Sequence, residues 1–470
     1  MIDALPDKGV PGEQILAELH EMRGADLPTH GGRLFAYVYD PAVDGLDELA
    51  RAAYAISAQV NGLDPTAFPS LLAMENALVG AAARLLGGDR DTVGSVTSGG
   101  TESLILAVKA ARDAHPEIAN PRLVVPSTAH AAFAKAAHYL RVALDVVPVT
   151  GLRADPPAMA AAISPDTVLV AASAPSYAHG VVDPIPQLAA IAAERGVRFH
   201  VDACFGGWVL PYLRRLGADL PAFDLSVPGV TSISVDLHKY AYAPKGVSVL
   251  LHRTEELRLP QYFAYAGWPG YTMINPVISS TRSGGPIAAA FATLRSIGDS
   301  GYQELAAQTR DAVRILADAV SATDGVRLYA PAETSVVCLA SDGVDLFVLA
   351  DELAARGWHT QPQMACADLP PTIHLTVTAA VRATAPGFAA DLEAAAAAAR
   401  ERGPIELPPL PPLTPEMITP ALIANLAEGL GLGGGDFSRM AAVNTLLNAA
   451  PPALREALLT GFLSLLQRPA

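Results

Sequence analysis

Short apolar runs rich in β-branched residues alternate with longer amphipathic stretches through much of the chain. These runs predict seven strands, because helices show a longer period of roughly 3.6 residues. The predicted strands cover residues 92–97, 123–126, 144–149, 167–172, 197–201, 231–235 and 247–251. Most are separated by a helical segment, so we expect an α/β fold with a mainly parallel seven-stranded sheet between helices. Ligands of such sheets bind at the carboxyl ends of the strands.

The elements on either side of the predicted sheet divide the chain into four parts. We expect an N-terminal arm and helix over residues 1–60, a large domain over 61–295 and a smaller α+β domain over 296–402. Residues 403–470 would then form a proline-rich linker followed by a helical tail. Glycines at 429–435 break the helical pattern of this tail.

The composition is that of a well-packed globular protein and limits its partners. Hydrophobic residues make up 51% of the 470 residues and charged residues 17%. Asp and Glu outnumber Lys and Arg by 47 to 32, and the net charge of −15 argues against nucleic acid or an anionic membrane as partner. We find no signal peptide and no apolar stretch of about 18 residues, so no integral membrane segment is expected. The three cysteines have neither metal-site spacing nor a disulfide framework, which favours a cytoplasmic protein without a metal site.

The turn after the sixth predicted strand carries a candidate nucleophile, Lys239, shortly after Asp236 and His238. A lysine amine beside apolar walls and another cation can have its pKa lowered enough to attack carbonyls. Lys245 supplies a second cation nearby. The alternative is an ordinary loop lysine, and an isolated His-Lys pair would favour it. Four other stretches, however, supply the remaining parts of a pyridoxal phosphate (PLP) site.

The first two of these stretches offer a phosphate site and a stacking ring. Ser98-Gly99-Gly100-Thr101 joins a predicted strand to a helix, so that backbone N–H groups point at whatever binds the helix N-terminus. The alternative is a tight turn with Thr101 as helix cap. His130, at the end of the next predicted strand, could lay its imidazole on an aromatic cofactor ring. A capping or core histidine is the alternative.

The other two stretches offer a buried carboxylate and a hydroxyl-rich loop. Asp202 follows an apolar strand, where a buried carboxylate is costly unless it faces a cation such as the protonated pyridine nitrogen of PLP. A helix-capping Asp is the alternative. The loop ISSTRSGG, residues 278–285, contains Thr281 and Arg282, and its alternative is a solvated linker between domains.

Taken together, these stretches resemble the blocks of the sphingosine-1-phosphate lyases, within the PLP-dependent decarboxylases of fold type I. The resemblance covers roughly residues 31–400 and is carried by VTSGGTES, AHAAF, HGVVDPIP, HVDACFGG, the HKY and APKG pieces, and STRSGG. It implies that Lys239 forms the Schiff base with PLP, that Asp202 pairs with the pyridine nitrogen and that His130 stacks on the ring. The resemblance also implies cofactor contacts at Gly99, Gly100, Thr101, His238 and Thr281. Catalytic roles are implied for Tyr39, His130, Lys239 and Lys245.

Such an enzyme is expected to be a homodimer in which the STRSGG loop reaches the neighbouring subunit's site. By this resemblance it would cleave a β-hydroxy amine, such as a sphingoid base 1-phosphate, to an aldehyde and a phosphoethanolamine-like amine. A base first takes the proton from the 3-hydroxyl, and Lys245, Lys239 or a nearby tyrosine could serve. The expected partner is thus a small-molecule primary amine, with lipid-like amines among the candidates.

The chain departs from these lyases where the substrate is expected to bind. Asn61-Gly62-Leu63-Asp64-Pro65 stands in place of Asn-Pro-Leu-His-Pro, and Asp64 would repel a substrate phosphate. Ser176 and Ala178 replace a polar residue and a proline ahead of His179. The cofactor half of the site is therefore intact, whereas part of the substrate half is changed.

Two alternatives to the carbon-carbon lyase follow from the same residues. An amino-acid decarboxylase would use the same cofactor half, with Lys245 or Arg282 as the cation that orients the substrate carboxylate. A non-catalytic protein with a PLP-enzyme fold would act as a binding partner instead. The presence of both Lys239 and Asp202 argues against this second alternative.

Overall fold

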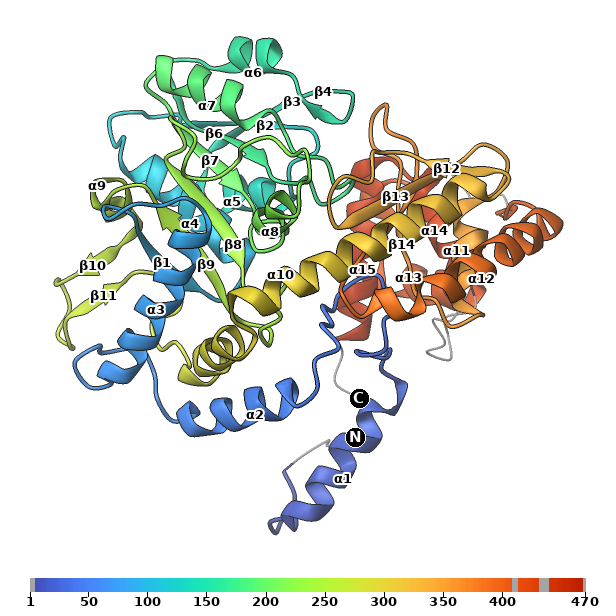
Figure 1. Ribbon diagram of the computed structural model, residues 1–470, viewed down its shortest axis with the longest axis horizontal. Helices are drawn as coiled ribbons and strands as arrows, with labels where there is room; N and C mark the ends of the chain where they lie inside the picture. Colours follow the sequence, from blue (N-terminus) through green and yellow to red (C-terminus); the bar gives the residue numbers. More distant parts are fainter. Residues whose placement is uncertain (1–4, 408–412, 431–438, 468–470) are drawn as a thin grey trace.

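A seven-stranded sheet forms the centre of the larger part of the molecule (Figure 1). The computed structural model describes residues 5–407, 413–430 and 439–467. Across the sheet the strands are β1 (Val93–Thr97), β9 (Ser248–His252), β8 (Ser232–Asp236), β7 (Arg198–Asp202), β6 (Thr167–Ser173), β2 (Arg122–Pro126) and β3 (Ala143–Val147). Strand β9 runs antiparallel to both of its neighbours, β1 and β8, whereas the other neighbouring strands are parallel to one another. The predicted α/β fold with a mainly parallel sheet is confirmed.

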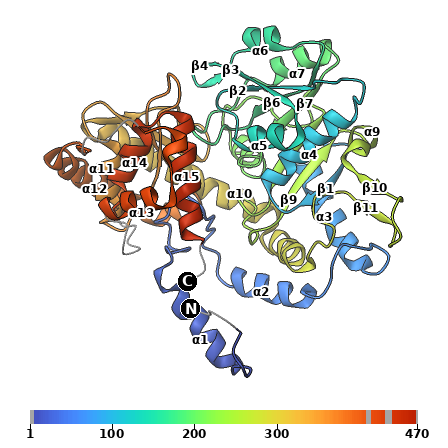
Figure 2. The same ribbon diagram turned by 180° about the vertical axis from the view of Figure 1, so that it is seen from behind.

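Helices cover both faces of this sheet, as Figures 1 and 2 show from opposite sides. They include α3 (Pro69–Leu85), α4 (Gly100–Asp113), α5 (Ala132–Leu140), α6 (Pro156–Ala162), α7 (Ile185–Glu194), α8 (Leu210–Arg215) and α9 (Glu255–Arg258). Along β6, Val170 and Ala172 join the apolar core that contains α7, whereas Ala171 joins the core that contains α4 and α5. Burial on both faces explains the continuous apolar run in this strand.

A long helix, α10 (Gly284–Ala322), connects the large sheet to a smaller α+β part (Figure 1). It is kinked at Gly298, whose φ of 66° is readily adopted by glycine. The smaller sheet is antiparallel, in the order β12 (Val326–Leu328), β13 (Val336–Ser341), β15 (Thr372–Thr376) and β14 (Gln361–Gln363). Helices α11 (Leu346–Ala354) and α12 (Val381–Arg402) pack with it around a separate apolar core.

The N-terminal helices lie outside these two parts. Helix α2 (Leu46–Ser57) packs on α10, whereas α1 (Gly12–Met22) projects from the molecule and has no buried residue (Figure 1). Within the described ranges, no helix is both long enough and apolar enough to cross a membrane.

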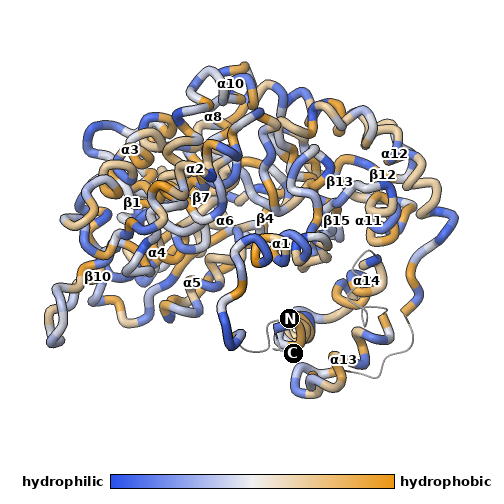
Figure 3. Tube along the Cα trace, turned by 90° about the horizontal axis from the view of Figure 1, so that it is seen from below, coloured by the Kyte–Doolittle hydropathy of each residue, from blue (hydrophilic) through white to orange (hydrophobic). Residues whose placement is uncertain are grey.

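In the part of the tail that the structure describes, there are three α-helices, α13 (Pro420–Gly429), α14 (Ala441–Ala449) and α15 (Pro452–Leu466). Seen from below, α13 and α14 lie at the edge of the molecule, outside α11 and α12 (Figure 3). Asp351 of α11 fixes the start of α14, because its Oδ1 accepts hydrogen bonds from the N–H groups of Met440 (2.8 Å) and Ala441 (3.1 Å). The predicted glycine break at 429–435 lies mostly outside the described residues, and the four domain limits remain predictions.

We expect Asp351→Ala to loosen the tail without unfolding the sheets. The substitution leaves two N–H groups of α14 unpaired, at a cost of about 1–3 kcal/mol. Hydrogen exchange of α14 should accelerate while that of α4 stays slow. Asp345→Ala is the matched control, because Asp345 also accepts two backbone bonds but caps α11 itself. Equal acceleration of α14 in both variants would contradict this role for Asp351.

Candidate active site

The carboxyl ends of β1, β2, β6, β7 and β8 surround a pocket of about 410 Å³ at one edge of the large sheet. All predicted cofactor residues except Thr281 line it, namely Gly99, Gly100, Thr101, His130, Asp202, His238 and Lys239. These residues follow four different strands. Their convergence is a consequence of the parallel strand order, which places these carboxyl ends at the same edge.

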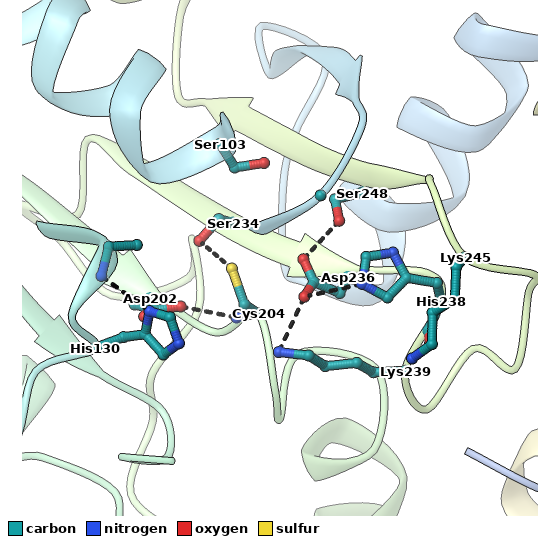
Figure 4. Close-up of polar contacts among 12 residues, drawn as sticks. Ser103, His130, Asp202, Cys204, Ser234, Asp236, His238, Lys239, Lys245 and Ser248 are labelled. Atoms are coloured by element: carbon teal, nitrogen blue, oxygen red, sulfur yellow. Dashed lines mark hydrogen bonds and ion pairs between the residues drawn. The ribbon is translucent and has the colours of Figure 1, made fainter. Parts of the chain in front are cut away.

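The carboxylate of Asp236, at the end of β8, is the centre of the polar contacts in this pocket (Figure 4). Only 2% of Asp236 is exposed. Its Oδ2 lies 2.9 Å from Nζ of Lys239 and 3.6 Å from Nε2 of His238, and its Oδ1 accepts a 2.6 Å hydrogen bond from Oγ of Ser248. Burial alone would raise the pKa of Asp236, but the charges of Lys239 and His238 reverse this effect and lower it.

The pKa of Lys239 is raised, which corrects the expectation that it is lowered. Burial does act to lower the pKa of this amine, as expected. The adjacent Asp236 carboxylate outweighs burial, and Cys204 and Asp202 add smaller effects of the same sign. Lys239 is therefore a cation paired with Asp236 in this structure. The sequence argument counted the apolar walls but not the carboxylate three residues earlier.

Gly99 and Gly100 bring the N-terminus of α4 to the same pocket. A Cβ atom on Gly100 would lie 2.8 Å from Sγ of Cys204 and 2.9 Å from Oδ1 of Asp236, so this close approach requires glycine. The N-cap residue is Gly99 and α4 begins at Gly100, so the alternative of Thr101 as the cap is wrong. The free N–H groups of this first turn suit an anion such as a phosphate.

Asp202 and His130 face the pocket from β7 and from the segment after β2 (Figure 4). Oδ1 of the buried Asp202 accepts the N–H of Cys204 at 3.1 Å. The exposed ring of His130 accepts the N–H of Ala132 through Nδ1 at 3.1 Å, so His130 satisfies part of the start of α5 and also lines the pocket. Burial, with the charge of Asp202, raises the pKa of Cys204 well above its usual value, and the thiol stays protonated.

Tyr39 and Lys245 lie together beside the pocket and are not part of its lining. Nζ of Lys245 is 4.9 Å from the centre of the Tyr39 ring, which in turn packs edge-on against Phe205 in the pocket wall. Loss of hydration and the charge of Lys239 lower the pKa of Lys245 to about 8. Burial raises the pKa of Tyr39 well above its usual value. Lys245 therefore changes charge near neutral pH, whereas Tyr39 stays protonated.

The loop that contains Thr281 does not reach the pocket of its own chain. Thr281 is exposed, and Arg282 forms a two-pronged ion pair with Glu75 of α3, with N–O distances of 2.9 and 3.0 Å. Glu102 of α4 holds the start of the loop by accepting the N–H of Ile278 at 2.8 Å. Arg282 is therefore paired with Glu75 in the lining of a different cavity, and it does not line the pocket that contains Lys239.

The sequence did not identify two residues of the site, Asp236 and Tyr177. It also assigned Asp64 to the substrate pocket, which the structure does not support. Asp236 was noted in the turn but not as part of the site, although a carboxylate at the end of an apolar strand was the signal used for Asp202. Tyr177, after β6, lines the pocket and stacks on His374 at 4.5 Å, a contact between distant segments that no local pattern reveals. Asp64 is exposed and accepts two bonds from Thr66, so it closes its own turn and lies outside the pocket lining.

A lysine at the end of β8, a carboxylate at the end of its neighbour β7 and a helix N-terminus facing both define a PLP-dependent enzyme of fold type I. The donors fit the cofactor, because the pocket offers an amine, a buried carboxylate and N–H groups for a phosphate. Residues 4–341 match the family described as the pyridoxal-dependent decarboxylase conserved domain, and residues 390–465 match a C-terminal HTH domain of pyridoxal-dependent enzymes. The chain belongs to the sphingosine-1-phosphate lyase family and is a PLP-dependent lyase.

Relatives and solved structures agree with this assignment. The chain is 36% identical over 381 residues to the sphingosine-1-phosphate lyase of Dictyostelium discoideum, which covers 80% of this chain and 70% of that protein. The structure of the Burkholderia pseudomallei sphingosine-1-phosphate lyase is similar with a TM-score of 0.80 and 35% identity, over 85% of this chain and 93% of that one. Glutamate decarboxylase of Lactobacillus brevis, at 19% identity and a TM-score of 0.75, shares the fold.

We expect the two lysines to react with an acetylating reagent over different pH ranges, because only a neutral amine attacks it. Lys245 should be half-maximally reactive near pH 8 and increasingly reactive above it. Lys239 should stay unreactive there, because its pKa is raised. Mass spectrometry of the cofactor-free protein measures both, with the exposed Lys135 as internal reference.

The variant Asp236→Asn should move the reaction of Lys239 to lower pH, since burial is then largely unopposed. Ser248→Ala is the control, because it removes a hydrogen bond to Asp236 and leaves the charge in place. An unchanged Lys239 profile in Asp236→Asn would show that this carboxylate does not set the pKa.

Proposed function

We propose that the enzyme cleaves the Cα–Cβ bond of a β-hydroxy primary amine, of which a sphingoid base 1-phosphate is the model substrate. The products would be an aldehyde and a phosphoethanolamine-like amine. The observation that carries this proposal is the convergence of Lys239, Asp202 and the N-terminus of α4 on one pocket, in a chain 36% identical to a sphingosine-1-phosphate lyase. We further propose that the enzyme acts in the cytoplasm, which suits its three free cysteines.

The residues around the pocket suggest how PLP would be held. Lys239 would bind its carbonyl carbon, Asp202 its pyridine nitrogen and His130 the face of its ring. Gly99, Gly100, Thr101 and His238 would hold the phosphate, with Thr281 supplied by a partner subunit. When bound, PLP supplies an electron sink for the electrons of the broken bond.

Lys245 is the best base for removing the proton of the substrate's 3-hydroxyl. A general base works best with a pKa near the operating pH, and its pKa of about 8 meets this condition. Tyr39 and Lys239 do not, because both have raised pKa values and keep their protons. Tyr39 instead positions Lys245 by packing its ring under the amine.

Decarboxylation is the weaker candidate because, apart from Lys239 itself, the described pocket lining contains no Lys or Arg that could bind the substrate carboxylate. Arg282 is paired with Glu75, and Lys245 lies beside the pocket and not in its lining. The cofactor half of the pocket would serve either reaction, so the identity of the product decides between them.

A homodimer is supported by the surface next to the Thr281 loop. The hairpin of β10 (Phe263–Tyr265) and β11 (Met273–Asn275) precedes this loop, and its large apolar side chains are exposed. They are Phe263, Tyr265, Trp268, Tyr271 and Ile274. Large contiguous apolar surfaces of this kind mark contacts with other protein chains.

We expect the PLP-loaded protein to release an aldehyde and an amine from long-chain base phosphates, detected by mass spectrometry alongside other β-hydroxy amines and an amino-acid panel. Lys239→Ala should reduce this release by about a thousandfold or more. Lys245→Gln should reduce it about a hundredfold, in keeping with loss of a general base. Carbon dioxide and an amine from an amino acid, without aldehyde, would instead establish the decarboxylase.

If each active site combines Lys239 of one subunit with Thr281 of the other, two variants that are inactive as homodimers should regain activity as a heterodimer. Thr281→Asp should inactivate the partner's site, because a carboxylate repels the cofactor phosphate. In a heterodimer of Lys239→Ala and Thr281→Asp subunits, purified through two different tags, one site has an intact lysine and an intact partner loop. We therefore expect about half of the wild-type activity from the two-fold symmetry. No recovery would mean that the loop serves the site of its own chain. An active Thr281→Asp homodimer would mean that the loop serves neither site.

A further inference from the structure

A second pocket, of about 450 Å³, lies between the large and small sheets next to the cofactor pocket. One wall comes from the segment after β2, with Thr128, and from the segment after β6, with His179. The opposite wall comes from β14 and from the loop that follows it, with Met364 and Leu369. Nothing in the cofactor-binding role of the first pocket accounts for this cavity.

This second pocket is neutral and has free hydrogen-bonding capacity. None of the described residues that line it is Asp, Glu, Lys or Arg. Thr128 and His179 are 8% and 4% exposed, and Oγ1 of Thr128 and Nδ1 of His179 have no hydrogen-bond partner within the described ranges. Buried polar atoms are paired in most proteins, so two such atoms in one cavity indicate a ligand that pairs with them. A ligand group that suits them is an uncharged hydroxyl on an aliphatic chain.

Tyr177 connects this second pocket to the reaction. Its side chain lines both pockets, and its ring is stacked on His374 of β15 at a centroid distance of 4.5 Å. A substrate bound at Lys239 that extends past Tyr177 therefore enters the second pocket. Ser176 and Ala178, on either side of Tyr177, are positions where the sequence departs from the related lyases.

The tail holds the outer wall of the second pocket in place. Asn448 accepts the N–H of Ala365 at 2.8 Å, and Nη1 of Arg455 donates to the Ala365 carbonyl at 3.3 Å. Ala365 lies between Met364 and Cys366, which both line the pocket. These hydrogen bonds hold the loop that forms this wall against α14 and α15, so the shape of the cavity is fixed by the fold.

We propose that the second pocket binds the chain of the substrate beyond the cleaved bond and selects a hydroxylated chain through Thr128 and His179. This inference rests on the proposed lyase function, because that function places the substrate amine at Lys239. Thr128 and His179 would be specificity-determining residues, with Tyr177 positioning the substrate between the two pockets.

Equilibrium binding tests the proposal without turnover. In a Lys239→Ala background with PLP, calorimetry should show that short-chain 4-hydroxysphinganine 1-phosphate binds about two- to tenfold more tightly than the sphinganine 1-phosphate of equal length, the range for one or two hydrogen bonds. Thr128→Val should abolish this ratio and Thr128→Ser should retain it. Thr293→Val is the matched control, because Thr293 in α10 is another buried hydroxyl without a partner in the described structure but does not line either pocket.

A ratio that survives Thr128→Val, or that falls equally in Thr293→Val, would overturn the proposal. Failure to bind either compound would overturn it as well. The aldehyde assay on the enzyme with Lys239 intact reports separately on the reaction. If the protein shows the binding preference but releases no aldehyde, the lyase proposal is refuted and the pocket assignment stands. If it releases aldehyde but shows no binding preference, the lyase proposal stands and the pocket assignment is refuted.

Discussion

The ionised carboxylate of Asp236 is the interaction on which the rest of the site depends. A buried charge costs several kcal/mol unless it is paired and hydrogen-bonded, so this residue needs the contacts made by Lys239, His238 and Ser248. Those contacts join the ends of β8 and β9 to the turn between them. The missing side chain of Gly100 lets α4 reach the same carboxylate. The charge of Asp236 thereby fixes the positions of Lys239 and of the first turn of α4 relative to each other.

The strand order explains why these groups share one edge of the sheet. Strands β2, β6, β7 and β8 are parallel, and β1 shares their direction because it pairs antiparallel with β9, which is itself antiparallel to β8. Five carboxyl ends then open towards the small sheet, and each contributes a short polar segment at low conformational cost. Ligands of open α/β sheets generally bind at this carboxyl edge.

The sequence predicted the seven strands, the mainly parallel sheet and the residues that line the cofactor pocket, because buried strands and strand-end motifs are local signals. It did not predict the raised pKa of Lys239, because that depends on how the turn after β8 brings the amine back to the carboxylate of Asp236. Tyr177 and β14 were also missed, the first because its partner His374 is about two hundred residues away and the second because QPQ has no apolar alternation. The placement of Thr281 stays a prediction, since it depends on a second chain.

The two pockets differ in the physics by which they can select a substrate. The cofactor pocket is built from charges that compensate one another, so changes there affect the reaction as a whole. The second pocket has polar atoms without charge, and its walls come from segments that lie far apart in the sequence. Unpaired buried donors and acceptors discriminate against a substrate lacking the matching group more strongly than an apolar wall does against an extra methylene. Membership of a lyase family therefore constrains the cofactor chemistry closely, whereas under our proposal the choice of substrate depends on a few neutral side chains around Tyr177.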